Sequence, residues 1–377
     1  MGILLLHAHG NFGIGQPSGR EVVSLPALDQ LADQFVYFLI NNKAFAVFSI
    51  MFGFSFFLQM KKNGENREEF TKVFGKRLFF LLLIGYLNAM VFRADILTKY
   101  AMMGFLLLVL HKLNTRILLM VAILLLIQIP EWVQFIKSMG DAGYEIAERR
   151  NEPLWDEIQK ISMAGSFFEL LRINMGDAFL EVWKLNFSSG RIYNILGYFL
   201  LGFLLGRSCF LNNLKSCRKI YLFVLTGASV LYLGLRHLRN LLPNYDNFSG
   251  ESLGLLDSLF TGYMDFLMVA IIMSVFVLLY QLQSFKVLLN ILTPYGRMSL
   301  TSYILQGFIG VFLYYGFGLG LYNFLGSGLN LAVAALIFLT LLAFSSIWFR
   351  YFLYGPLEYL WRGLTHNNFN YPLKRNA

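Results

Sequence analysis

Long apolar segments alternate with short polar ones along the whole chain, and this pattern is its dominant structural signal. A helix needs about 20 mainly apolar residues to cross the hydrocarbon core of a bilayer. Nine segments meet this need to within a few residues: 34–60, 77–93, 96–111, 116–133, 191–207, 219–236, 258–281, 297–317 and 329–349. The pattern predicts an all-α polytopic bundle with about nine full transmembrane spans, forming one integral membrane domain over residues 1–377.

Basic residues gather in every second loop and predict the orientation of the bundle. The first basic segment runs from Lys61 to Arg77. The later basic loops and the tail contain Lys112, Arg116, Arg207, Lys215, Arg218, Lys219, Lys286, Arg297, Arg350, Arg362, Lys374 and Arg375. The other loops are acidic, as from Glu145 to Glu157, or uncharged, as from Gly318 to Gly328. Because positively charged loops stay in the cytoplasm, the C-terminus is expected inside and residues 7–33 outside.

The first residues do not fit this topology easily. Met1 to Leu6 are apolar but too few to span a bilayer. Either these residues lie in the membrane interface at an external N-terminus, or the chain begins inside a first helix whose earlier half is missing. A signal peptide is not indicated, because neither a charged start nor a cleavage site is evident. Of the two interpretations we prefer the second, a truncated first helix or a misplaced start codon.

The segment 131–190 differs from the rest and predicts an external acidic loop followed by an amphipathic helix. Apolar residues recur near helical spacing between Phe167 and Phe187, and charged residues take the other positions. We expect this helix to lie on the outer membrane surface or over the bundle, with Phe168, Leu171 and Phe179 facing the bundle or lipid.

Composition excludes a soluble protein and several classes of function. Hydrophobic residues make up 57% of the chain and charged residues only 14%, whereas a soluble domain has about a quarter of its residues charged. The net charge of +9 lies in short loops and therefore indicates topology rather than nucleic-acid binding. Two cysteines, Cys209 and Cys217, give neither a disulfide framework nor a metal site. No nucleotide loop, hydrolase elbow or metalloprotease motif is present, which leaves transport, membrane-embedded group transfer or an accessory role.

Ionisable residues at membrane depth are costly and commonly mark function, so those near the predicted outer face are the candidate site. They are His7, His9, Arg93, Asp95, Arg236, His237, Arg239 and Asp265. Each also has a structural interpretation. Arg93 and Asp95 can pair locally, or Asp95 can favour the next helix N-terminus. The segment Arg236 to Arg239 can snorkel to the interface, and Asp265 can bond a neighbouring helix. Two histidines alone do not make a metal site, and none is expected.

The pairs Gly202/Gly206 and Gly316/Gly320 predict close helix packing.

Five stretches carry a resemblance to a known family. They are GILLLHAHGNFG near the start, FAVFSIMFGFSFFLQM, RLFFLLLIGYLNAMVFRADILTKYAMMGFLL, and YGRMSLTSYILQGFIGVFLYYGFGLGLY with SIWFRYFLYGPLEYLWRGLTH near the end. Together they resemble the YeiB-type bacterial inner-membrane proteins, known as domain of unknown function 418. The matching positions are Asp95, Ile96, Leu97, Tyr100, Gly296, Arg297, Thr301, Tyr303, Gly355, Pro356, Glu358, Trp361 and Arg362.

Two positions depart from the family pattern. After GILLL the family usually shows Asn, where this chain has His7, and after the Gly-aromatic pair it often shows His, where this chain has Asn88. The family's usual opening, an acidic residue and Arg-Gly before the GILLL run, is also absent. The resemblance implies a multi-pass protein of the bacterial inner membrane.

The family is similar in span pattern to a wider group of transmembrane acyltransferases, and this likeness implies the leading hypothesis. It is acyl transfer from a cytoplasmic thioester, such as acyl-CoA, to an envelope carbohydrate or lipid-linked glycan, with no tightly bound cofactor. His7 or His9 would be the base, oriented by Asp95. Arg93, Arg236, His237 and Asp265 would bind the acceptor, and Lys76, Arg77, Arg297 and Tyr303 the donor. The alternatives are a transporter or permease for a small polar solute and a non-enzymatic envelope accessory protein. Membrane lipid is the one partner expected in every case, and the oligomeric state is not indicated.

Overall fold

The computed structural model describes residues 1–15, 23, 25–62, 67–140, 151–208, 217–241, 250–370 and 372–374. Within these ranges the chain is helical, apart from two isolated β-bridges, and the prediction of an all-α fold is confirmed. The basic residue Lys215, the cysteine Cys209 and the first part of the acidic loop, through Arg150, lie outside the described residues.

Within the described residues, ten α-helices overlap substantially with the segments that the apolar pattern predicts as spans. They are α3 (Lys43–Lys62), α4 (Arg67–Val91), α5 (Leu97–Leu110), α6 (Thr115–Leu126), α7 (Ile129–Gly140), α11 (Arg191–Arg207), α12 (Arg218–Leu241), α13 (Gly250–Tyr280), α15 (Ser299–Tyr314) and α16 (Ser327–Tyr351). The others are α1 (Gly2–His9), α2 (Pro26–Phe35), the π-helical turn η2 (Val36–Ile40), α8 (Glu152–Ala164), α9 (Phe167–Met175), α10 (Asp177–Ser188), α14 (Gln283–Arg297) and α17 (Pro356–His366).

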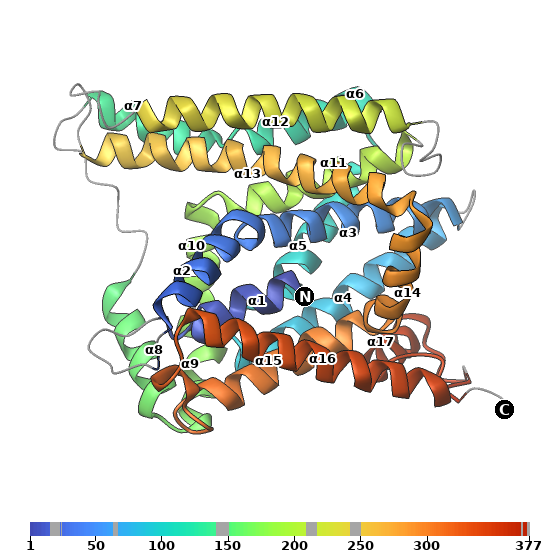
Figure 1. Ribbon diagram of the computed structural model, residues 1–377. Coiled ribbons are helices and arrows are strands. Elements are labelled where there is room, and N and C mark those ends of the chain that lie inside the picture. The colour runs from blue at the N-terminus through green and yellow to red at the C-terminus, as the bar shows by residue number, and fades with distance from the viewer. Residues whose placement is uncertain are drawn as a thin grey trace.

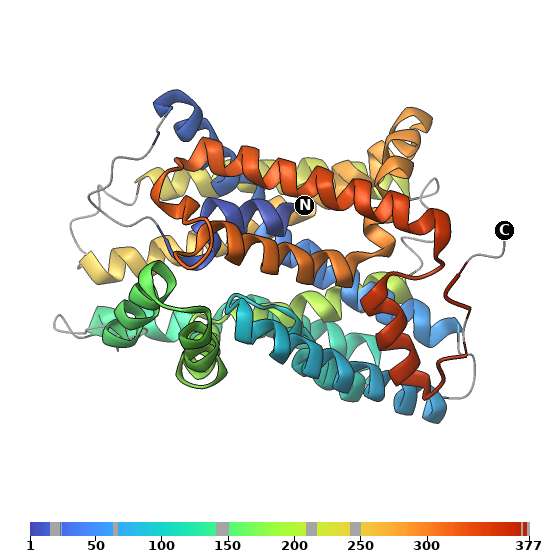
Figure 2. The same ribbon diagram turned by 90° about the horizontal axis from the view of Figure 1, so that it is seen from below.

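The helices form a bundle of roughly antiparallel elements (Figure 1). One side is the pair α12 and α13, which packs on α7, and the centre holds α11 packed between α3, α5 and α6. The opposite side holds α15 and α16, with α1 against α16 and α17 against α4. Figure 2 shows α8, α9 and α10 gathered together at one end of the bundle, the end at which α11 begins and α4 ends.

The number of predicted spans is confirmed only in part. Five helical segments are long and apolar enough to cross a membrane: 26–62, 68–91, 218–241, 251–280 and 327–351. A sixth is possible if α6 and α7, which meet at 44°, count as one bent span. The predicted spans 96–111, 191–207 and 297–317 correspond to α5, α11 and α15, which have 14, 17 and 16 residues and are short for a full crossing.

The shortness of α5 results from a turn that dips into the bundle. At Gly85, an added Cβ would lie 2.7 Å from the backbone nitrogen of Thr98, so α5 begins level with Gly85 rather than with the end of α4 at Val91. Six residues of helix separate these levels, about 9 Å along the axis. The turn that carries Asp95 therefore lies inside the protein.

Glycines allow the central helices to approach closely, as predicted for Gly202 and Gly206. An added Cβ at Gly202 would lie 1.9 Å from the carbonyl oxygen of Ile50 in α3, and one at Gly206 would meet the ring of Phe57. The prediction for Gly316 and Gly320 is wrong, because both follow the end of α15. Gly316 instead packs on the carbonyl of Met163, and Gly320 adopts a left-handed φ of 60° in a turn.

The predicted amphipathic helix from Phe167 to Phe187 is two helices rather than one. It breaks at Gly176, where α9 ends and α10 begins. A capping box between Ser166 and Glu169 starts α9, and these hydrogen bonds hold the pKa of the Glu169 carboxyl below its usual value. Leu171 packs toward the core and the Phe179 ring contacts the Tyr86 ring at 5.2 Å, whereas Phe168 is 80% exposed.

Candidate functional site

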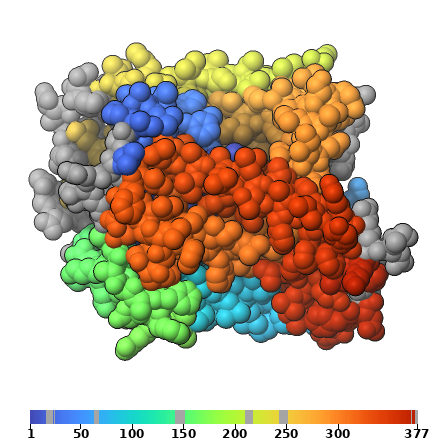
Figure 3. Space-filling model, turned by 60° about the horizontal axis from the view of Figure 1, so that its bottom comes forward, coloured from blue at the N-terminus to red at the C-terminus, as the bar shows by residue number. Residues whose placement is uncertain are grey.

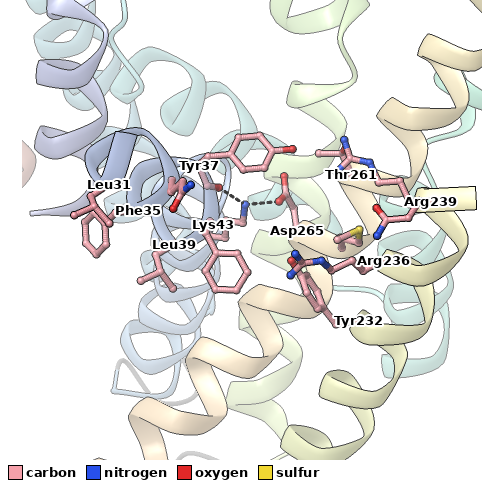
Figure 4. Close-up of a pocket in the computed structure, with 14 residues that line it drawn as sticks. Leu31, Phe35, Tyr37, Leu39, Lys43, Tyr232, Arg236, Arg239, Thr261 and Asp265 are labelled. Carbon is pink, nitrogen blue, oxygen red and sulfur yellow. Dashed lines mark hydrogen bonds and ion pairs between the residues drawn. The ribbon is translucent and has the colours of Figure 1, made fainter. Parts of the chain in front are cut away.

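A cavity of about 720 Å³ opens between η2, α12 and α13. This volume is in the range of small-molecule sites. Its polar lining comes from Gln34, Tyr37, Lys43, Tyr232, Arg236, Arg239, Asn240, Thr261 and Asp265, and its apolar lining from Leu31, Phe35, Phe38, Leu39 and Met264. Figure 4 shows Lys43 between Tyr37 and Asp265, with Arg236 and Arg239 across the cavity on α12. We call this space the polar cavity.

A buried ion pair forms one wall of the polar cavity. Lys43 Nζ lies 2.5 Å from Asp265 Oδ1, and the two side chains are 7% and 10% exposed. Lys43 also donates to the carbonyl of Tyr37 at 3.0 Å, and Asn42 Nδ2 donates to Asp265 Oδ2 at 2.8 Å. Arg191 in turn donates to the amide oxygen of Asn42 at 3.1 Å. This network joins α3, α11 and α13, so both charges are compensated where they are withdrawn from solvent.

Asp95 is buried in the turn between α4 and α5, and neither a histidine nor Arg93 is its hydrogen-bond partner. Its Oδ1 accepts from Asn88 Nδ2 at 3.0 Å and its Oδ2 from the backbone nitrogen of Thr98 at 2.8 Å. Arg93 points elsewhere, to the carbonyl of Gly13 and to Ser162 Oγ at 3.3 Å. The local Arg93–Asp95 pair is therefore wrong, and the alternative that Asp95 serves the N-terminus of the next helix is correct.

The two predicted catalytic histidines lie in different surroundings. The His7 ring packs on the Phe92 ring at 4.6 Å, and its Nδ1 is buried without a hydrogen-bond partner in the described structure. The buried Asn88 Oδ1, one turn before Phe92, also lacks a partner there. His9 Nε2 instead lies 2.8 Å from Asp33 Oδ1 at a partly exposed position. His7 therefore leaves a buried nitrogen free beside Phe92, and Asn88 leaves an amide oxygen free beside Asp95, whereas His9 is already paired.

The predicted acceptor-binding residues do not form one site. Arg236 and Asp265 line the polar cavity, but His237 is exposed and does not line it. Arg93 lines a different cavity, next to Lys99 and Arg191. Arg239, which also lines the polar cavity, makes a bidentate pair with Asp257 at 2.6 and 2.9 Å.

Two of the four predicted donor-binding residues line one apolar cavity of about 270 Å³. Arg77 and Trp361 stand at one end of it, and Tyr100 and Tyr303 lie in the same lining. The Arg77 guanidinium lies over the Trp361 indole at 4.5 Å, and the Tyr303 hydroxyl accepts from the backbone nitrogen of Ile96 at 3.0 Å. We call this space the apolar cavity. Lys76 is exposed outside it, and Arg297 is exposed and donates to the carbonyl of Leu353.

A third cavity, of about 370 Å³, adjoins both the polar cavity and the apolar cavity. It shares Leu39 and Lys43 with the polar cavity, and it shares Phe48, Met51, Ser299 and Tyr303 with the apolar cavity. Figure 3 shows a hollow on this face of the molecule, between the blue residues of α2 and α3 and the orange residues of α14. Lys43 and Tyr303 are thus the junctions of a row of three cavities, which we call the cavity row.

Lys43, Asn42, Lys99 and Arg191 were not among the candidates from the sequence. Lys43 is the one charged residue between Gln34 and Met60, within a segment predicted to span the membrane, and this isolation was the available signal. Glu358 was identified only as part of a family motif. Its carboxylate accepts from the backbone nitrogens of Leu300 and Thr301 at 2.7 and 3.0 Å, and it thereby caps α15. Among the described residues, no three His, Cys, Asp or Glu side chains come together as metal ligands.

Comparison with known proteins finds one family model and several similar bacterial proteins. Residues 205–368 match the family model DUF418, a protein of unknown function. The uncharacterized protein YxaH of Bacillus subtilis is 28% identical over 90% of this chain and 83% of its own length. An uncharacterized 39.9 kDa protein from the amylase 3′ region of Bacillus acidopullulyticus is 25% identical over 100% of this chain and 94% of its own length.

The uncharacterized protein YeiB of Escherichia coli is 45% identical over 85 residues, 22% of this chain and 21% of its own length. No solved structure matches the chain significantly. The family model and the similarity to YxaH and YeiB confirm the resemblance to the YeiB-type DUF418 family that was inferred from the motifs.

Proposed function

We propose that this protein is a membrane-embedded acyltransferase that moves an acyl group from a cytoplasmic thioester to an envelope carbohydrate or lipid-linked glycan. The observation that carries the proposal is the cavity row. It begins at Arg77 among apolar side chains, passes Tyr303 beside the Asp95 turn, and ends in a polar cavity suited to hydroxyl-rich groups. In a CoA thioester the carbonyl lies between the phosphate-bearing arm and the acyl chain, so phosphates held at Arg77 would place the carbonyl further along the row.

In this reaction an acceptor hydroxyl attacks the thioester carbonyl, the C–S bond breaks, and an ester and a free thiol result. The base must take the hydroxyl proton, and His7 has a buried nitrogen without a partner in the described residues. Asn88 Nδ2 is held by Asp95, which leaves its amide oxygen to accept from a second hydroxyl of the carbohydrate acceptor. Arg77 supplies a cation for donor phosphates, stacked in place on Trp361.

The proposal includes the topology expected from the loops: nine spans and a cytoplasmic C-terminus, in the bacterial inner membrane. Single cysteines at Gly326 and Asn151, in a variant without Cys209 and Cys217, should react with an impermeant maleimide added from outside. A cysteine at Ser208, at the end of α11, should react only after the membrane is opened. External labelling of Ser208 would contradict the orientation.

The function is tested with purified protein in nanodiscs that receives acyl-CoA and glycan acceptors. We expect thiol release that depends on the acceptor. Arg77→Gln should raise the donor KM, whereas Lys72→Gln, an exposed cation on the same helix, should leave it unchanged. Absence of thiol release across short and long acyl donors, from protein that is folded and monodisperse, would refute the proposal.

Transport of a small polar solute is the second candidate, and the buried Lys43–Asp265 pair favours it. A compensated charge pair between helices is a common feature of a solute or proton pathway. The pair lies at the junction of the polar cavity with the middle cavity, so its opening would connect the two. Uptake of solute by sealed proteoliposomes without acyl turnover would support this candidate and exclude the first.

A further inference from the structure

A cavity of about 420 Å³ lies beside the Asp95 turn, separate from the cavity row. Three cations line it: Arg93 from the turn, Lys99 from α5 and Arg191 at the start of α11. Trp155 of α8 and the C-terminal part of α10, including Asn186 and Ser188, complete the wall. No Asp or Glu of the described residues belongs to this lining. We call it the cationic cavity.

The partners of the three cations are neutral. Arg93 donates to the carbonyl of Gly13 and to Ser162, and its guanidinium lies 5.4 Å from the Trp155 ring. Lys99 Nζ donates to the backbone carbonyl of Asp95 at 2.5 Å. Arg191 donates to the Asn42 amide and lies over the Phe45 ring at 4.8 Å. Within the described part of the chain, none of the three forms an ion pair with a carboxylate.

Two carboxylates are close but face other groups. Both oxygens of Asp95 accept hydrogen bonds, from Asn88 and from the backbone of Thr98, and Lys99 reaches only the main-chain oxygen of Asp95. Glu131 packs against Gly190. It lines a different cavity of about 430 Å³, to which Arg191 also contributes, and does not line the cationic cavity. These carboxylates reduce the positive potential without occupying the space between the cations.

Burial of these cations destabilises the folded protein unless an anion enters the cavity and compensates their charge. Arg93 and Lys99 are each only 6% exposed. Cations withdrawn from water are destabilising without a counter-charge, and like charges around one cavity raise the cost further. The start of α11 adds to the effect, because Gly190, in a left-handed conformation, and Arg191 place the positive end of a 17-residue helix at the cavity wall.

We propose that the cationic cavity binds an anionic phosphate group, carried by a lipid or lipid-linked headgroup or by a soluble phosphate-bearing ligand. Two guanidinium groups and an ammonium group suit an anion with several acceptor oxygens. The inference concerns binding alone and does not rest on acyl transfer. The chemistry of the bound group is the same for both sources, so the experiment has to distinguish them.

The first arm uses the full chain in phosphatidylcholine nanodiscs, titrated with sodium phosphate against sodium chloride of equal ionic strength. Ligand binding to the folded state raises the unfolding temperature in a saturable way. We expect such a rise for the wild type. Arg191→Gln and Lys99→Met should weaken the apparent phosphate affinity about tenfold or more. Arg116→Gln, which removes an exposed cation on α6, should leave it unchanged.

The second arm replaces part of the neutral lipid with phosphatidylglycerol and counts the anionic lipids that remain bound in native mass spectrometry. Phosphate binding without lipid retention identifies a soluble ligand, and retention that both variants abolish identifies a headgroup. No response in either arm, or an equal loss in Arg116→Gln, overturns the proposal.

The unfolding temperature without ligand separates binding from structural roles. Removing an uncompensated cation should leave this temperature unchanged or raise it. If Arg191 only supports Asn42, Arg191→Gln will instead lower the temperature and keep the phosphate response. Should Arg191→Gln fail to fold, Lys99→Met, which conserves side-chain volume, decides the question alone.

Discussion

The Lys43–Asp265 pair predicts a large and non-additive change in stability. Replacing Lys43 with Met leaves the Asp265 carboxylate in a site that is 10% exposed, with the Asn42 amide as its remaining partner. Replacing Asp265 with Asn leaves the Lys43 ammonium with the carbonyl of Tyr37. Removing one partner of a buried pair costs about 3–5 kcal/mol, because the other charge stays buried and uncompensated.

The double variant Lys43→Met/Asp265→Asn should cost much less than the sum of the single variants, because neither charge is left alone. We expect a coupling free energy of about 2–3 kcal/mol, measured as a double-mutant cycle by reversible denaturation in micelles. The matched control is the more exposed pair Arg239–Asp257, with side chains 27% and 47% exposed, for which Arg239→Gln should cost about 1 kcal/mol or less. Single variants close to wild type, or losses that simply add, would refute this reasoning.

Three further predictions concern single features. Gly202→Ala should lower the unfolding temperature by several degrees because its Cβ would collide with the Ile50 carbonyl, whereas Gly227→Ala, where nothing lies within 4 Å, should leave it unchanged or raise it. Glu358→Gln should reduce the unfolding free energy by about 1–3 kcal/mol through loss of the charged cap on α15, with the exposed Glu157→Gln as control and denaturant melts as the measurement. His7→Asn should reduce acceptor-dependent thiol release at least about a hundredfold, and the exchange His7→Asn/Asn88→His should restore part of it; equal activity of the single variant and wild type would exclude His7 as the base.

The apolar pattern predicts the helices well and the number of crossings less well. All nine predicted spans are mainly helical, because long runs of mostly apolar residues favour helix in lipid, where the backbone groups must bond within the segment. The segment 96–111 forms a helix of only 14 residues because the turn before it folds back into the bundle level with Gly85, a tertiary contact that no local pattern encodes. The break at Gly176 is visible as a glycine in the sequence, but helical spacing continues across it.

Only some residues of the candidate site could be predicted from the sequence. Arg236 and Asp265 were identifiable as charges near apolar spans, and they line the same cavity. The residue that pairs with Asp265 comes from a segment 222 positions earlier, and only the packing of α13 on α3 brings Lys43 to it. Arg191 was counted as the flank of a span, although its side chain is directed into the protein toward Asn42.

The surroundings of Asp95 connect the two departures from the family pattern. Position 88 often carries His in the family, and here Asn88 donates to Asp95 Oδ1, where a histidine would form a carboxylate–imidazole pair. Position 7 usually carries Asn, and here His7 packs on Phe92, the residue one turn beyond Asn88. The chain thus keeps one imidazole and one amide around Phe92 but exchanges their positions. Because Asp95 holds the amide rather than the imidazole, it positions Asn88 and caps α5 in this chain. Under the proposed acyl transfer, the proton would therefore pass to the unpartnered nitrogen of His7 rather than to an imidazole held by Asp95.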